Sequence, residues 1–154
     1  MDWTYRTEAK GIQSWILATD KLREMAGASE LIERLTDWAR RCISKMGGTV
    51  ESAAAGGVTA VFHDQNSLAQ FTRFWPVVVD RRAPGLQVFQ AWAEGAPSKC
   101  WDVLQQRLAA ARNQPPPQLP EAGPLMLRAG RSGAPAIGRD GDGVPAGGRP
   151  VDVA

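Results

Sequence analysis

A small set of residues in this 154-residue chain has the chemistry to handle a metal ion or a phosphate. Glu8 offers a carboxylate near the end of an alternating segment, and Gly56-Gly57 interrupts the apolar run SAAAGGVTAVF. Glycine adopts positive φ without a Cβ clash, so the pair predicts a tight turn between two strands. Ser29 can cap a helix whose first amides could instead receive a phosphate, and capping is the expected role. Gln13 can hydrogen-bond a base or its own sheet edge, and the sequence leaves both open.

The acids that metal-dependent nucleotidyl transfer needs are missing beside the glycine pair. Two Mg²⁺ ions about 4 Å apart must be held by hard oxygen ligands over the reacting phosphate. Val58 and Thr59 follow the glycines. The nearest flanking acids are Glu51 and Asp64, and at about 3.3 Å per residue Asp64 lies ~20 Å from the turn, with Glu51 little nearer. We therefore assign no catalytic and no metal-binding residue, and expect Glu8 to be a solvated acid on the outer face of an edge-side strand.

Bulk composition excludes several other classes of function. A net charge of +2 with 22% charged residues gives no warrant for a nucleic-acid-binding surface. Two cysteines without a CxxC spacing and a single histidine, His63, rule out a structural zinc site within one chain. Cys42 and Cys100 are expected to be reduced thiols. No apolar run is long enough to span a membrane, so we expect a soluble cytoplasmic protein.

Hydrophobic patterning predicts a folded unit over residues 1–114 and a disordered tail over residues 115–154. The tail holds 8 prolines and 8 glycines in 40 residues and no aromatic residue, so it has too little apolar surface to offset its ordering entropy. The first half of the folded unit is predicted to hold a strand over 2–10, a helix interrupted near residue 19 and ending at Gly47-Gly48, and two strands near 49–55 and 58–63. The second half is predicted to hold a helix capped by Asp64 or Asn66 and kinked or broken at Pro76, then a strand at 86–92 and a helix capped by Ser98.

This order, β-α-β-β-α-β, is the α+β ferredoxin-like arrangement with a four-stranded antiparallel sheet. Both crossover helices then cover one face, so the other face is predicted to be free of helices. The strands of the hairpin send small or apolar residues to both faces, which is typical of an interface rather than of a solvated surface. We expect self-association, or pairing with a partner, through the sheet face next to Gly56-Gly57, with Ala54 and Ala60 pointing outward.

The segment EAKGIQSWILATDKLREMAGASELIERL, residues 8–35, resembles the palm domain of the large subunit of type III CRISPR effector complexes, which is related to GGDEF cyclases and polymerase palms. Family members carry an acid, two residues, GIQ and a hydrophobic pair, followed by a helix entry of the form lre..GaS.l. The matching positions here are Glu8, Gly11-Ile12-Gln13, Trp15-Ile16, Leu22-Arg23-Glu24 and Gly27-Ala28-Ser29. The resemblance covers roughly residues 3–93, and the glycine pair follows at a fitting distance.

What the resemblance implies is a fold like a polymerase palm, a nucleotide site on the sheet face and a role in antiviral defence. Active members make cyclic oligoadenylates from ATP at a GGDD hairpin with two metal ions, whereas this chain has GGVT. The implied ligand is ATP with Mg²⁺. The implied nucleotide-binding residues are Glu8, Gly11, Gln13, Ser29, Gly56 and Gly57.

Three interpretations follow from these observations. The first is a degenerate palm that binds nucleotide or a partner palm without catalysis of its own. Its partners would be a second palm, including a second copy of this chain, or other CRISPR effector subunits, with RNA contacted only indirectly. The second is a nucleotide cyclase or polymerase subunit whose missing acids come from another subunit. The third is a plain ferredoxin-like interaction domain that binds no nucleotide.

Overall fold

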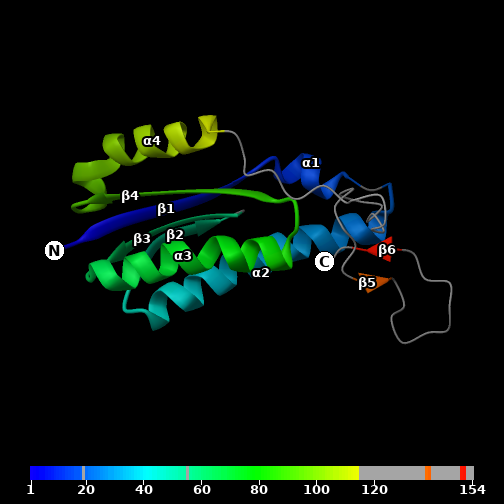
Figure 1. Cartoon of the computed structure of the whole chain (residues 1–154), viewed down its shortest axis with the longest axis horizontal. Coiled ribbons are helices and arrows are strands. Elements are labelled where there is room, and N and C mark those ends of the chain that lie inside the picture. Colours follow the sequence, from blue (N-terminus) through cyan, green and yellow to red (C-terminus); the bar gives the residue numbers. More distant parts are fainter. Residues whose placement is uncertain (19, 55, 115–137, 140–149, 152–154) are drawn as a thin grey trace.

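The computed structural model describes residues 1–18, 20–54, 56–114, 138–139 and 150–151 (Figure 1). The helices and strands in chain order are β1 (Trp3–Lys10), α1 (Ile12–Ile16), α2 (Leu22–Lys45), β2 (Thr49–Ala54), β3 (Gly57–Phe62), α3 (Gln65–Arg82), β4 (Gln87–Glu94), α4 (Pro97–Asn113), β5 (Gly138–Arg139) and β6 (Pro150–Val151). The short strands β5 and β6 pair antiparallel. The rest of the predicted disordered tail lies outside the described residues.

Strands β1 to β4 form one antiparallel sheet in the order β2-β3-β1-β4, which confirms the predicted α+β arrangement. Glu8 of β1 pairs with Gly57 of β3 on one side and with Phe89 of β4 on the other. The expectation that β1 lies toward the edge is therefore wrong. Each helical crossover carries the chain past a neighbouring strand, so the first strand ends up between the third and the fourth.

The main core lies between the sheet and the helices α2 and α3, which run side by side below it in Figure 1. The alternation of β1 sends Trp3, Tyr5, Thr7 and Ala9 to this side, and Tyr5 and Thr7 are buried, as the sequence predicted. Phe71 of α3 meets the Tyr5 ring edge-on, with 5.2 Å between the ring centroids. The buried stripe of α2 consists of Ala28, Leu31, Ile32, Leu35, Ala39 and Ile43.

Helix α3 follows its cap, Asp64, and runs without a break through Pro76. The Asp64 carboxylate accepts hydrogen bonds from the backbone and side chain of Ser67, which confirms the predicted cap and holds the pKa of Asp64 below its usual value. Proline lacks the N–H that would bond the carbonyl four residues earlier, here that of Thr72. Gln90 of β4 donates to this carbonyl over 3.1 Å. The predicted break is therefore absent because the sheet satisfies the freed acceptor.

Helix α4 lies on the opposite face of the sheet, over β4 and β1 (Figure 1). Leu104 and Leu108 of this helix are fully buried against small residues of β4, in a second and smaller cluster. The expectation of a face free of helices is thus wrong for half of the sheet. The predicted cap is also wrong, because α4 follows Ala96 and starts with Pro97, a residue favoured in the first turn of a helix.

The structure also bears on what the sequence predicted for two alanines, for the two cysteines and for membrane-spanning segments. Ala60 is fully buried against the main core, so its predicted outward position is wrong, whereas Ala54 is exposed. A bulge near Val50 and Ser52 changes the alternation of β2 relative to β3. Cys42 and Cys100 are both free thiols. Among the described residues, none of the helices has the length and apolar character needed to cross a membrane.

Candidate functional site

The candidate site lies at the end of the sheet where the β2–β3 hairpin meets β1 and α2. Gly56 adopts φ of 81°, and a Cβ atom at this position would lie 2.9 Å from the Cδ1 atom of Ile12. The Gly56 amide donates to the Thr36 hydroxyl of α2 over 3.2 Å, and its carbonyl accepts from the Ala9 amide over 3.1 Å. Only glycine meets both the positive φ and the close approach, so the turn is fixed against its neighbours.

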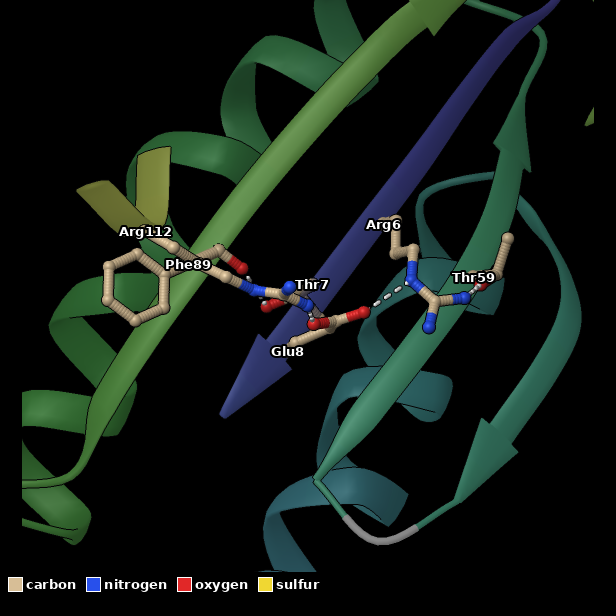
Figure 2. A network of polar contacts seen from close by, with 6 residues as sticks. All are labelled: Arg6, Thr7, Glu8, Thr59, Phe89 and Arg112. Carbon is tan, nitrogen blue, oxygen red and sulfur yellow. Dashed lines mark hydrogen bonds and ion pairs between the residues drawn. The ribbon is translucent and has the colours of Figure 1, made fainter. Parts of the chain in front are cut away.

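Glu8 sits beside this hairpin in a network with two arginines (Figure 2). Its Oε1 atom accepts from Arg6 Nε over 2.8 Å, and its Oε2 atom pairs with Arg112 from the last turn of α4. Arg6 also donates through Nη1 to the Thr59 hydroxyl over 3.1 Å, and its guanidinium lies 5.2 Å from the centroid of the Trp101 ring. Only 18% of the Glu8 side chain is exposed, so the expectation of a solvated acid is wrong.

The two residues after the glycines point to opposite faces of the sheet. Val58 is 3% exposed and belongs to the main core, whereas Thr59 is 4% exposed and faces Arg6. Alternation along a strand makes this separation unavoidable. Thr59 therefore shares the side of the sheet on which Glu8 lies, and Val58 does not.

The residues at this site do not fit the pair of magnesium ions that an active palm would use. Mg²⁺ requires oxygen ligands, usually carboxylates, and Glu8 is the one carboxylate in the network of Figure 2. Both of its oxygens are already bound to guanidinium groups. Within the part of the chain that the structure describes, no three histidine, cysteine or acidic side chains are grouped closely enough to hold a metal ion.

The remaining predicted site residues lie at the same end of the sheet or in the helices beside it. Gly11 follows β1 with φ of 69° and precedes α1, on which Gln13 is exposed. Ser29 is exposed in the interior of α2, and the prediction that it caps this helix is wrong because α2 begins seven residues earlier, after Lys21. It lies one turn before Ile32, whose side chain approaches the hairpin at Gly56. Glu8, Gly56 and Gly57 are therefore brought together. Gly11 and Gln13 come just after β1 in the chain, and Ser29 belongs to the neighbouring helix α2.

Three residues of this site, Arg6, Thr36 and Arg112, were not predicted from the sequence. Arg6 could have been found, because residues two apart on a strand share a face and Arg6 stands two before Glu8. The other two are brought in by helix packing, since Thr36 comes from α2 and Arg112 from α4. No local pattern links either of them to the hairpin.

Comparison with solved structures identifies the architecture. The chain is similar to a bacterial light-regulated adenylyl cyclase, with a TM-score of 0.56 and 14% identity over 74% of this chain and 71% of that one. It is also similar to Csm1 of T. onnurineus, with a TM-score of 0.57 and 15% identity over 90% of this chain. The fold is a palm of the nucleotide-cyclase type. No protein-family model and no curated protein matches the chain.

The palm covers different shares of these proteins. It spans 25% of the Csm1 chain and 41% of a second light-regulated adenylyl cyclase structure, which matches with a TM-score of 0.54 and 14% identity. At this level of identity the likeness describes the backbone arrangement.

Proposed function

We propose that this protein is a non-catalytic palm module of the type III CRISPR large-subunit kind, acting in antiviral defence by binding nucleotide or a partner palm. The observation that carries the proposal is the state of Glu8, whose carboxylate is shared between Arg6 and Arg112. Val58 and Thr59 add no carboxylate beside it. The hairpin of a palm is kept, and its metal-binding chemistry is replaced by a network of guanidinium groups.

The charge of this network favours an anion over a cation. Two arginines and one glutamate leave one net positive charge beside the hairpin. A guanidinium group presents several N–H donors in a plane, a geometry that suits phosphate oxygens. A divalent cation at the same place would be repelled by both arginines. This supports binding of the phosphates of ATP without a metal ion held by the protein.

Direct measurement of ATP binding and turnover tests this proposal. Purified protein with labelled ATP and Mg²⁺ or Mn²⁺ should bind ATP and form no cyclic or linear oligoadenylate. Arg112→Gln should weaken ATP binding several-fold, whereas Lys99→Gln, which removes one positive charge from an exposed position of the same helix, should not. Product from the pure chain would overturn the non-catalytic assignment, and product only after a second subunit is added would favour a cyclase completed in trans.

Pairing with a second palm has support from the hairpin itself. Strand β2 forms one edge of the sheet. Helix α4 packs on β4 and β1, which lie toward the other edge. Unpaired edges and exposed small side chains such as Ala54 are suited to pairing with another chain. Ala54→Lys should therefore abolish self-association measured by light scattering, with an unchanged thermal midpoint. A wild-type protein that is strictly monomeric at high micromolar concentration would exclude the homodimer and leave only a different palm as partner.

A further inference from the structure

A groove between α2 and α3 is bordered by none of the polar residues of the hairpin site and is not used by the function proposed above. It has a volume of about 460 Å³. Helix α2 contributes Trp38, Arg41 and Lys45 at intervals of three and four residues, and α3 contributes Phe74, Val77 and Arg81 at the same intervals. Residues at this spacing lie on one face of a helix, so two parallel rows of side chains border the groove over about 10 Å.

The groove combines exposed apolar side chains with unbalanced positive charge. Phe74 is 45% exposed and Val77 is 52% exposed, although both are large apolar residues. Four cations border the groove and no acidic residue does. The four are Arg41, Lys45, Arg81 and Arg82.

None of these four cations forms an ion pair with a described residue. Asp37, the acid just before the α2 row, is paired with Arg40 over 3.6 Å. Asp80 precedes Arg81 on α3 but does not border the groove. The cations of the groove are thus available for pairing with acidic groups of another molecule.

We propose that this groove, the α2–α3 groove, binds an acidic amphipathic helix of a partner protein. An amphipathic helix in a groove between two helices places its apolar residues at intervals of three and four, which matches the two rows of this groove. Phe74 and Val77 would contact the apolar face of that helix, and the four cations would pair with acidic side chains along its edges. Binding at this surface leaves the hairpin accessible, because the groove belongs to the helical layer and not to the sheet.

The floor of the groove argues for a protein helix over a nucleic acid. Single-stranded nucleic acids bind by stacking bases on exposed aromatic faces. Trp38 already carries the guanidinium of Arg82, 5.5 Å from the centroid of its ring. Among the other residues that border the groove, Val77 and Val78 are aliphatic and Trp75 is buried, so Phe74 is the exposed aromatic side chain that remains.

Selection from a displayed library of 16-residue amphipathic helices on the full chain tests the proposal. The enriched sequences should carry Asp or Glu on both sides of an apolar stripe. Their affinity, measured by fluorescence anisotropy, should fall about tenfold or more for Arg81→Glu and for Val77→Asp, and should fall as salt is raised. Arg73→Glu is the matched control, because it makes the same charge change at an exposed position of α3 outside the groove, and it should change the affinity by less than twofold.

Three results would overturn the proposal. The first is a library that yields no acidic enrichment, and the second is binding that responds equally to Arg81→Glu and Arg73→Glu. The third is a labelled 12-nucleotide RNA that binds more tightly than the selected helices and loses affinity with Arg81→Glu, which would assign the groove to nucleic acid. Thermal unfolding of each variant separates loss of binding from loss of fold.

Discussion

On the sheet face covered by α2 and α3, the rings of Tyr5, Phe62, Phe71 and Trp75 form a continuous aromatic cluster. On the face covered by α4, Leu104 and Leu108 pack on small residues, and beside them Arg6, Glu8 and Arg112 form a polar network. The first face buries large apolar side chains, which contribute most of the free energy of folding. The second face buries less apolar surface and holds the charges.

The two faces are separated by a single step along a strand. Tyr5 and Thr7 of β1 face the aromatic side, whereas Arg6 and Glu8 face the polar side. On β3 the same step separates Val58 from Thr59. Positions 58 and 59, which follow the glycine pair, are therefore not equivalent, because Val58 belongs to the apolar core and Thr59 to the site.

The largest expected effect comes from placing an acid at each of these two positions in turn. Val58→Asp puts an unpaired carboxylate into the apolar core and should cost about 4–5 kcal/mol, a large part of the stability of a domain this size. Thr59→Asp puts the carboxylate beside Arg6 and should leave the protein folded. Urea denaturation followed by tryptophan fluorescence measures both. Equal destabilisation by the two variants would contradict the separation of the two faces.

Truncation of one large side chain on each face should give the next largest difference. Phe71→Ala should cost about 3–5 kcal/mol, because its ring contacts those of Tyr5 and Trp75. Leu104→Ala should cost about 2–3 kcal/mol, the lower part of the range for leucine, since it belongs to a small cluster that includes Ala91, Ala93 and Cys100. Free energies of unfolding from chemical denaturation provide the test. A greater loss for Leu104→Ala would show that the cluster under α4 contributes more to stability than the aromatic cluster.

A smaller effect is expected when the charge of Glu8 is removed. Glu8→Gln leaves Arg6 and Arg112 facing each other and should cost about 1–2 kcal/mol, reduced from the buried-pair value because both guanidinium groups are partly exposed. Glu30→Gln is the matched control, since it breaks the pair with Arg34, in which both side chains are 61% exposed. That control should change stability by less than about 0.5 kcal/mol. If Glu8→Gln is equally neutral, the network does not hold α4 to the sheet.

The smallest expected effect is a pH dependence of the stability that comes from the Asp64 cap at the start of α3, the helix that carries Phe71 and Trp75. Hydrogen bonds from Ser67 lower the pKa of Asp64 below 3.8, so this cap stabilises the fold above pH 3.8 and the stabilisation is lost as the pH falls through the lower folded pKa. Helix α4 has no side-chain cap of this kind. Asp64→Asn keeps a capping side chain without its charge and should flatten the loss of stability in acid, measured by thermal midpoints at several pH values. Asp80→Asn is the matched control, because it removes one carboxylate from an exposed position of the same helix outside the cap.

Much of the fold could be predicted because its signals are local. The alternation of β1, the apolar stripe of α2 and the glycine turn each lie within a short segment, and the structure contains all three. The extent of α3 could not be predicted, because the carbonyl freed by Pro76 is satisfied by Gln90, a residue 14 positions further along the chain. The candidate site divides in the same way. Glu8 and the glycines carry a local pattern, whereas Arg112 is brought to Glu8 by a helix that starts 89 residues later.

Local signals fix the order of the elements and the tight turn at Gly56-Gly57, and the residue types alone leave positions 58 and 59 without an acid. These features depend on backbone preferences and residue identity, which act over a few residues. Packing in three dimensions places β1 between two strands, lays α4 over part of the second face and pairs Glu8 with two arginines. Burial and ion pairing depend on which surfaces meet in space, and residues 8 and 112, far apart in the sequence, lie together only in the folded domain.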